Sequence, residues 1–507
     1  METALPDFPP LSESIRVNVC VVGAGIAGMT AAYLLARTGR AVVLIDDGPI
    51  AGGETGRTTA HLTAALDDRY YRIETLHGRD GSRIAAASHT AAIDRIETII
   101  SVEDIACEFE RLDGYLFLGG GGTKADIERE LRATHRAGLS TTETVQRAPI
   151  DSFDTGIALR FPRQAQFHPL KYLNGLARAI LRDGGKIYCG THAAKIEDGE
   201  PAKVTTADGH VISADNIIVA TNTPVNDWLI IHSKQAAYRT YVIGARVPPN
   251  SVPRALYWDT PNPYHYIRIE SSAKSESGPE HDILIVGGED HKTGQADDAP
   301  RRFDCLEQWT RERFPMVESI DYRWSGQIME SVDYMGYIGR NPGSDRHIYI
   351  ATGDSGNGMT HGTIAGILLT DLVLGLKNPW QSLYDPSRVE IRAAPRYVRE
   401  NLNVAEQYAD WFTAGDVESE EEIPVGAGAV IKRGRKKFAV YRDEHGEVHV
   451  RSAVCPHLSG IVDWNSAEKS WDCPCHGSRF DPYGRVINGP AISDLGTAVL
   501  EPAKVSR

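Results

Sequence analysis

Hydrophobic and polar positions divide the start of the chain into a strand, a turn, a helix and a second strand. Residues 17–22 form a β-branched run that is typical of a buried parallel strand. Glycines follow at positions 23, 25 and 28, and an apolar helix pattern then extends to Ala36. Residues 41–45 predict a second buried strand, which ends at Asp46. The pattern therefore predicts a β–turn–α–β unit.

The turn of this unit has the spacing of a dinucleotide-binding fingerprint. Gly23 permits a tight turn, Gly25 lets the backbone approach a pyrophosphate, and Gly28 allows the helix and strand to pack closely. The helix N-terminus directs N–H donors at the phosphates, and Asp46 is placed to accept hydrogen bonds from ribose hydroxyls. Both NAD and FAD use this arrangement, so the fingerprint alone leaves the two cofactors open.

Two later segments favour FAD. Residues 51–61, AGGETGRTTAH, are a small-residue stretch that suits backbone lying against a flat ring. Residues 347–360 have the pattern of a strand, a glycine-rich turn and a helix start. The positive end of such a helix is placed to stabilise the anion at the pyrimidine edge of a reduced flavin.

Residues 16 to about 376 resemble the flavin oxidoreductases of the D-amino acid oxidase, glycine oxidase and sarcosine oxidase superfamily. The matching pieces, in order, are GAGIAG, GETGRTTAH, VISADNIIVATN at 211–222, WSGQIMESVDYMGYIG at 324–339 and ATGDSGNGMTHGTIAG at 351–366. The resemblance implies bound FAD and oxidation of the C–N bond of a small amine or amino acid by hydride transfer to flavin. The FAD contacts it implies are Gly23, Gly25, Ile26, Ala27, Gly28, Asp46, Asp47, Gly56, Arg57, Thr58, Thr59, His61, Ala220, Thr221, Gly353, Asn357, Gly358, Met359 and Thr360.

The resemblance also implies an antiparallel substrate-binding sheet. Tyr264, Tyr266 and Arg268 alternate along a predicted strand and so share one face, which makes them candidate catalytic or substrate-facing residues. An ordinary half-exposed strand is the equally supported alternative. His61 is a fourth candidate, because the similar dimethylglycine and sarcosine dehydrogenases carry FAD covalently on a histidine after a threonine in this region. Non-covalent contact at His61 is the expected case.

The C-terminal region carries a second centre. Short β runs at 429–431, 437–441 and 448–450, with a turn at 443–446, predict a small antiparallel barrel. One cysteine and one histidine then stand in each of two loops: Cys455 with His457, and Cys473 with His476. This alternation fits a [2Fe–2S] cluster in which two thiolates hold one iron and two imidazoles hold the other. Zinc is the alternative metal.

Residues 424–507 accordingly resemble a Rieske ferredoxin domain with those four ligands. In the Rieske protein of cytochrome bc complexes a cysteine at the position of Cys475 pairs with one in the first loop. This chain has Ser459 and Gly460 in that loop, so we expect a free thiol at Cys475. Phe480 stands where high-potential members have a tyrosine hydroxyl, and we therefore expect a lower reduction potential.

The predicted fold class is an α/β Rossmann-like FAD-binding domain with an α+β antiparallel-sheet substrate domain, plus a C-terminal all-β Rieske domain. A chain of 507 residues is long enough for several such units. The expected segments are an N-terminal tail (1–15), three FAD-binding segments (16–82, 155–225 and 320–376), two substrate-domain segments (83–154 and 226–319), a helical tail with an acidic linker (377–423) and the Rieske domain (424–507).

Charge and composition exclude several other classes. The net charge of −14 argues against nucleic acid as a partner, because nucleic-acid binding rewards clustered Lys and Arg. No apolar stretch has the length of a membrane span, and the N-terminal residues do not have the pattern of a secretory signal. Seven cysteines do not make a disulfide scaffold, and we expect a cytoplasmic protein.

Flavin accepts two electrons together, whereas a [2Fe–2S] cluster passes one at a time, so the pair predicts an electron relay. We expect electrons to leave through the cluster to an external acceptor, either a protein or oxygen. Two alternatives stay open: electrons that flow inward from a donor for reduction or monooxygenation, and a non-catalytic redox sensor or carrier. A Rieske oxygenase is disfavoured because the chain has no D-x-x-H-x-x-x-x-H pattern. The substrate, the acceptor and the oligomeric state are not determined by the sequence.

Overall fold

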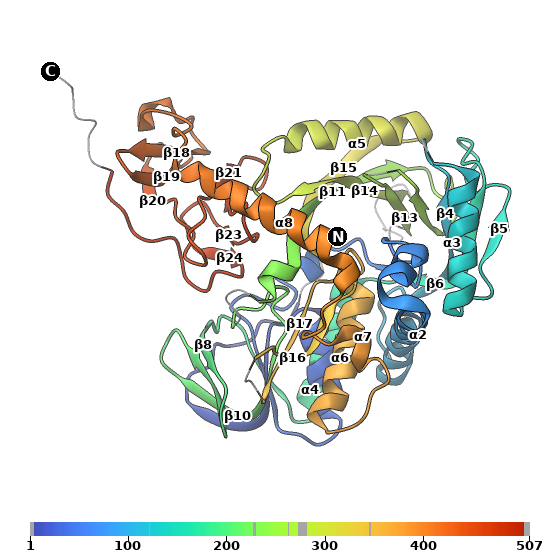
Figure 1. The fold of residues 1–507 in the computed structure, drawn as a ribbon, viewed down its shortest axis with the longest axis horizontal. Helices are drawn as coiled ribbons and strands as arrows, with labels where there is room; N and C mark the ends of the chain where they lie inside the picture. Colours follow the sequence, from blue (N-terminus) through green and yellow to red (C-terminus); the bar gives the residue numbers. More distant parts are fainter. Residues whose placement is uncertain are drawn as a thin grey trace.

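The computed structural model describes residues 5–120, 122–226, 230–261, 263–271, 281–343 and 346–500. Two large sheets form the body of the molecule, and two small sheets form a lobe at one side of it (Figure 1). We call residues 413–500 the C-terminal lobe. The predicted N-terminal tail and Rieske domain also include residues 1–4 and 501–507, which lie outside the described residues.

The first large sheet has the strand order β16-β17-β10-β1-β2-β7. All neighbours along this path pair in parallel except β16, which is antiparallel to β17, and a β8–β9 hairpin extends from β10. The strands are β1 (Ile15–Val22), β2 (Val42–Ile45), β7 (Lys186–Tyr188), β8 (Ala193–Glu197), β9 (Ala202–Thr206), β10 (Val211–Val219), β16 (Tyr337–Arg340) and β17 (Ile348–Thr352).

Helices α1 (Ile26–Ala36), α4 (Pro169–Arg182) and α6 (Gly358–Val373) cover one apolar face of this sheet, and α2 (Tyr70–Glu103) packs against α6. The other apolar face packs against the β8–β9 hairpin and against Leu11 and Ile231. The first turn is tight: a Cβ on Gly28 would lie 1.9 Å from the carbonyl oxygen of Gly23. Helix α6 packs equally closely on α1, since a Cβ on Gly362 would lie 2.5 Å from Cγ2 of Ile26. Glycine at these positions therefore sets how closely the elements around the first turn approach.

The second large sheet is mainly antiparallel and has the order β15-β11-β14-β13-β12-β4-β6-β3, with β5 paired to β6 and one parallel pair, β12–β4. Helices α3 (Lys124–Ala137) and α5 (Ala299–Arg313) lie against it. Its strands are β3 (His61–Leu62), β4 (Glu110–Phe117), β5 (Glu143–Val145), β6 (Ala158–Gln166), β11 (Gln235–Val247), β12 (Leu256–Asp259), β13 (Tyr266–Ser271), β14 (Asp282–Lys292) and β15 (Ser319–Ser331).

The C-terminal lobe contains two small antiparallel sheets. The first comprises β18 (Ala427–Arg433), β19 (Lys436–Arg442) and β20 (Val448–Ser452). The second comprises β21 (Asp463–Asn465), β22 (Ser470–Asp472), β23 (Arg479–Phe480) and β24 (Val486–Asn488). The three β runs predicted at 429–450 fall in the first sheet.

A helical connector joins the body to this lobe. It consists of α7 (Gln381–Tyr384), α8 (Ala394–Gln407) and the short turn η4 (Tyr408–Trp411), and α8 runs from the body toward the lobe (Figure 1). The remaining 3₁₀ turns are η1 (Glu54–Arg57), η2 (His232–Lys234), η3 (Ile391–Ala393) and η5 (Glu420–Glu422).

The predicted fold class is confirmed: an α/β Rossmann-like unit, a mainly antiparallel sheet with flanking helices, and an all-β C-terminal lobe. Within the described part of the chain, no helix combines the length and the apolar character that crossing a bilayer requires. The carboxyl ends of β1, β10 and β17 face the second large sheet, and the candidate site lies there.

Candidate functional site

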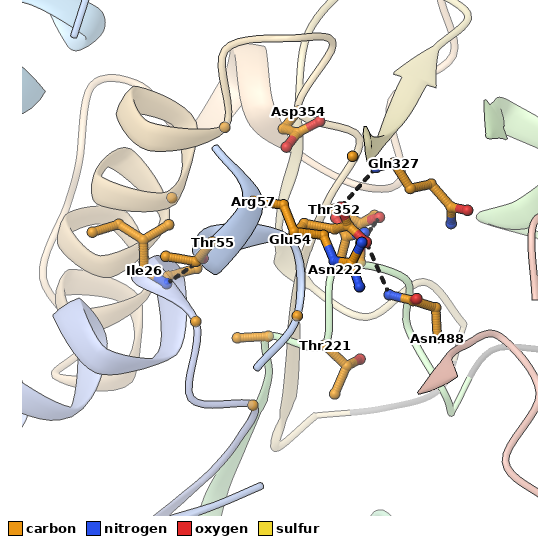
Figure 2. Close-up of a pocket in the computed structure, with 18 of the residues that line it drawn as sticks. Ile26, Glu54, Thr55, Arg57, Thr221, Asn222, Gln327, Thr352, Asp354 and Asn488 are labelled. Atoms are coloured by element: carbon orange, nitrogen blue, oxygen red, sulfur yellow. Dashed lines mark hydrogen bonds between the residues drawn. The ribbon is translucent and has the colours of Figure 1, made fainter. Parts of the chain in front are cut away.

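A cavity of about 900 Å³ lies between the two large sheets. Its wall combines the first glycine turn, the η1 segment, the start of α6 and strands of the second sheet (Figure 2). Of the predicted FAD contacts, the wall includes Gly23, Gly25, Ile26, Ala27, Asp46, Asp47, Arg57, Thr58, Thr59, His61, Ala220, Thr221, Asn357, Gly358 and Met359.

Four predicted FAD contacts are not in the wall as the described residues form it: Gly28, Gly56, Gly353 and Thr360. Gly28 packs on the turn instead, and the Thr360 hydroxyl lies 2.7 Å from Nδ1 of His89. The wall also contains residues that the sequence did not single out. Among these are Glu54, Asp67, Thr191, His192, Gln327, Asp354 and a C-terminal stretch, residues 486–489 and 491–494.

The glycine turn holds its shape through hydrogen bonds from two other segments. The Asp46 carboxylate accepts from the backbone N–H of Ala24 at 2.6 Å and of Gly48 at 2.8 Å. The Thr55 hydroxyl accepts from the N–H of Ile26 at 3.1 Å, at the start of α1. Burial raises the pKa of Asp46 to about 7. The N-cap residues Gly25 of α1 and Asn357 of α6 make no side-chain cap bond, and Thr55 accepts from the N–H of Ile26. The other N–H groups of these two helix starts suit the phosphates and ring edge of FAD.

One end of the cavity is aromatic. The rings of Tyr264 and Tyr266 have centroids 5.7 Å apart, and the His61 ring meets Tyr266 edge-on at 5.7 Å. The Tyr264 hydroxyl donates to the Asp67 carboxylate at 2.7 Å. Burial raises the pKa of Asp67 to about 6 and, with the nearby Arg268 charge, lowers the pKa of His61 to about 3. At neutral pH this end therefore has a carboxylate and a neutral imidazole.

Of the four substrate candidates, His61, Tyr264 and Tyr266 line the described cavity and Arg268 does not. Arg268 is buried and pairs with Glu270 at 2.9 Å, and the described wall of the cavity does not include it. His61 has a neighbour at each ring nitrogen: the Thr59 hydroxyl at 3.1 Å and the Ile267 carbonyl at 3.3 Å. At this end of the cavity, Asp67 is available to a cationic group. Arg268 is paired with Glu270 and is not available to bind a carboxylate.

The second centre lies in the C-terminal lobe, where two loops bring Cys455, His457, Cys473 and His476 together. The loops are closed by backbone bonds from Cys455 N–H to Gly460 at 2.8 Å and from Gly477 N–H to Cys473 at 3.0 Å. All four side chains are buried, and the two imidazole rings have centroids 5.1 Å apart. Nδ1 of His476 is buried with no hydrogen-bond partner among the described residues. Two thiols and two imidazoles, one of them with an unpartnered nitrogen, fit a [2Fe–2S] cluster.

The helical connector and the body of the molecule support the first ligand loop. The Tyr408 hydroxyl donates to the Leu458 carbonyl at 2.6 Å, and the Trp411 indole donates to Ser459 at 2.9 Å. The His232 ring packs edge-on against His457, with centroids 4.8 Å apart. All seven cysteines of the chain, Cys475 included, are free thiols.

One side chain connects the cavity with the ligand loop. Gln327 lines the cavity, and its amide donates to the carbonyl of Gly477 at 3.0 Å, directly after His476. Its backbone N–H donates to Glu54 at 2.6 Å (Figure 2). Gly477 has φ +78°, and a Cβ there would lie 2.3 Å from Cβ of Ala237. The ligand loop therefore touches the wall of the cavity directly.

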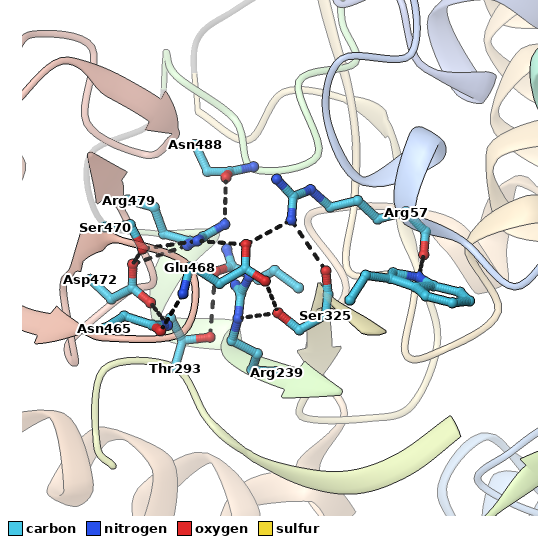
Figure 3. Close-up of polar contacts among 12 residues, drawn as sticks. Arg57, Arg239, Thr293, Ser325, Asn465, Glu468, Ser470, Asp472, Arg479 and Asn488 are labelled. Atoms are coloured by element: carbon cyan, nitrogen blue, oxygen red, sulfur yellow. Dashed lines mark hydrogen bonds and ion pairs between the residues drawn. The ribbon is translucent and has the colours of Figure 1, made fainter. Parts of the chain in front are cut away.

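A buried charge network holds the lobe in this position (Figure 3). Glu468 of the lobe lies 2.8 Å from Arg57, 3.3 Å from Arg239 and 3.6 Å from Arg479. The Asp472 carboxylate pairs with Arg479 at 3.0 Å. Although burial opposes it, the Arg239 charge holds the pKa of Glu468 below its usual range. Both Arg239 and Arg479 are almost fully buried, so each depends on these carboxylates for compensation.

The chain matches two family models. Residues 18–372 match the FAD dependent oxidoreductase family, and residues 413–499 match the Rieske [2Fe-2S] domain. The putative Rieske 2Fe-2S iron-sulfur protein YhfW of Bacillus subtilis (strain 168) is 34% identical over 496 residues, which cover 97% of this chain and 95% of that protein. Gamma-glutamylputrescine oxidoreductase of Escherichia coli (strain K12) is 28% identical over 387 residues, which cover 73% of this chain and 86% of that one.

Solved structures agree on the fold. Glycine oxidase from Geobacillus kaustophilus aligns with a TM-score of 0.59 at 16% identity, covering 74% of this chain and 99% of that chain. L-Proline dehydrogenase from P. horikoshii aligns with a TM-score of 0.58 at 18% identity, and the alignment covers 75% of this chain and 98% of that chain. These alignments leave out about a quarter of this chain.

Proposed function

We propose that this chain, which belongs to the FAD-dependent oxidoreductase family acting on amines and amino acids and ends in a Rieske [2Fe–2S] domain, passes substrate electrons through the Rieske domain to an external acceptor. Bound FAD supplies hydride acceptance from a C–N bond, and the cluster supplies one-electron transfer. The chain's own residues supply binding, orientation and a short path between the two centres.

The contact through Gln327 carries this proposal. Its side chain belongs to the wall of the flavin cavity and also donates to Gly477, the residue after the ligand His476. Two redox centres that served separate reactions would not need such a contact. The flavin-binding part of the chain and its Rieske domain are thus joined at Gln327 and Gly477, between the two proposed cofactor sites.

We assign the FAD contacts to the predicted residues that line the cavity, and the cluster ligands to Cys455, His457, Cys473 and His476. The orphaned Nδ1 of His476 supports the ligand assignment. We also propose a cytoplasmic location, in keeping with seven cysteines of which none forms a disulfide.

For the substrate we propose a cationic amine that binds at the aromatic end. Asp67 would attract the ammonium group there, while Tyr264 and Tyr266 form apolar walls beside it. Arg268 does not serve as a carboxylate clamp in this arrangement, because Glu270 already neutralises it. The neutral His61 ring packs beside Tyr266 and adds no charge to this end of the cavity.

The test is anaerobic mixing with amines, followed by stopped-flow absorbance. Flavin bleaching should come first and reduction of the Rieske cluster second. We expect Gln327→Leu to slow the second phase several-fold, and to slow it more than the first phase, because the contact with the ligand loop is lost. Gln327 also lines the flavin cavity, so the flavin content of the variant is measured beside the two phases.

The matched control is Gln295→Leu. Gln295 also donates its amide to the ligand loop, at the Pro474 carbonyl and 3.2 Å, but it is not in the described wall of the flavin cavity. Equal slowing in both variants would show that Gln327 acts only by holding the loop. A cluster that stays oxidised after flavin bleaching in the wild-type protein would contradict the outward relay.

A further inference from the structure

We infer that residues 486–494 of the Rieske domain form part of the FAD site and cover the adenosine end of the cofactor. FAD would then be held between the two domains, and the Rieske domain would be a cofactor-binding element as well as an electron carrier. This inference rests on bound FAD and does not depend on the substrate or on the direction of electron flow.

The cavity wall carries the first observation. Val486, Ile487, Asn488, Ile492 and Asp494 line the same cavity as the glycine turn. They lie more than 400 residues after that turn in the sequence, in strand β24 and in the loop that follows β24. The described cavity is therefore closed on one side by the Rieske domain.

The position of the segment identifies the part of FAD that it faces. His192 lies between the two domains: its Nε2 is 2.9 Å from the Ile492 carbonyl, and its Nδ1 is 3.4 Å from the Asp47 carboxylate. Asp47 follows Asp46, the residue at the end of β2 that is placed for the adenosine ribose. The loop after β24 therefore lies at the ribose end, opposite the aromatic end with Tyr264.

Ile487 provides a second, independent observation. Its side chain is 42% exposed, although it lies in the wall of a cavity. An adenine ring that covered this side chain would remove its apolar surface from water. Ile487 therefore has the chemistry expected of an adenine contact.

The docking of the segment is specific. The Asn488 amide donates to one Glu54 oxygen at 3.2 Å, and the backbone of Gln327 donates to the other at 2.6 Å (Figure 2). The Glu54 carboxylate thus joins the Rieske domain to β15 beside the middle of the cavity. Together with the charge network around Glu468, this contact holds β24 over the cofactor site (Figure 3).

The experiment measures FAD binding by the full-length chain after removal of its flavin. We expect Ile487→Ser to raise the FAD dissociation constant roughly tenfold, because the apolar contact with the adenine ring is lost. Visible circular dichroism of the cluster checks that the Rieske domain of the variant is folded. ADP, which carries only the adenosine end and the phosphates, should compete with FAD in the wild-type chain and compete less well in the variant.

The matched control is Val425→Ser. Val425 is 56% exposed on the same domain and does not line the described cavity, so its replacement should leave FAD affinity unchanged. Equal FAD affinity in wild type and Ile487→Ser would overturn the inference, and so would the absence of ADP competition in the wild-type chain. Should Ile487→Ser lose its cluster signal, Ile487→Thr, which keeps a branched side chain, provides the same comparison. Failure of amine oxidation would leave these binding results unaffected.

Discussion

Asp67 shows how the fold sets the charge of a single side chain at the aromatic end of the cavity. It accepts a hydrogen bond from Tyr264, and Arg69 and Glu330 are the charged groups that act on it most strongly. Burial outweighs the hydrogen bond and the Arg69 charge, so its pKa rises to about 6. The carboxylate is therefore ionised above that pH and protonated below it.

This titration predicts a pH dependence of amine binding. The attraction between Asp67 and an ammonium group is present above pH 6 and is lost as the pH falls through about 6. We expect KM for an amine substrate to rise in that window, and Asp67→Asn to raise KM roughly tenfold at pH 8 and to remove the pH step. Steady-state kinetics between pH 5 and 8 measures both effects.

Asp290→Asn is the control for Asp67. Asp290 is a second carboxyl with a pKa raised by burial, to about 7, but it is not in the described cavity wall. A KM step near pH 6 that persists in Asp67→Asn and disappears in Asp290→Asn would move the assignment to Asp290.

At the scale of elements, β22, β23 and the turn at Glu468 are joined to β11 and η1 by charge rather than by apolar contact. Three arginines converge on Glu468, and two of them are almost fully buried. Removing the carboxylate that they share leaves the buried Arg239 without its ion-pair partner, whereas Arg479 keeps its pair with Asp472. The cost of such a loss is usually larger than the value of an exposed ion pair.

We therefore expect Glu468→Gln to lower the free energy of unfolding by roughly 3 kcal/mol. Urea unfolding, followed by flavin fluorescence and by the visible circular dichroism of the cluster, measures this change. Glu444→Gln is the control, because Glu444 pairs with Lys469 at 2.6 Å on the exposed surface of the same domain. That variant should lose less than about 1 kcal/mol. Equal losses in the two variants would show that the network does not hold the domain.

At the scale of the whole molecule, the Rieske domain is docked with its ligand loop against the flavin cavity. Gly477 contacts Ala237 and Gln327, and the ring of His457 packs on His232. In this arrangement the second ligand loop already contacts a residue of the cavity wall. This arrangement differs in kind from a mobile carrier that must travel between two docking positions.

Intramolecular electron transfer should therefore be independent of solvent viscosity. We expect the rate of cluster reduction after flavin bleaching to stay constant in stopped-flow experiments with increasing glycerol, because large domain motions are the steps that viscous solvent slows. Sucrose at matched viscosity is the control for specific effects of glycerol. A rate that falls in proportion to viscosity would show that the domain moves before each transfer.

Features of the fold and of the site that depend on residues close together in the sequence were predictable. The dinucleotide-binding unit and the [2Fe–2S] ligands followed from the glycine turn and from the paired Cys and His loops, whose members lie within a few residues of one another. FAD and the family followed from the resemblance of five short pieces between residues 23 and 366. Some details of the site were within reach too. Glu270 stands two residues after Arg268 on one strand face, so alternation along β13 was a signal that the arginine has a partner.

The amino-acid sequence by itself determined which chemistry the chain carries, because short motifs create their own local geometry. Only the tertiary structure decided how the centres are joined: Gln327 against Gly477, His192 between Asp47 and Ile492, and Ile487 in the flavin cavity. These pairs lie up to hundreds of residues apart in the sequence. Their contacts depend on the packing of two domains, and neither periodicity nor spacing encodes that packing.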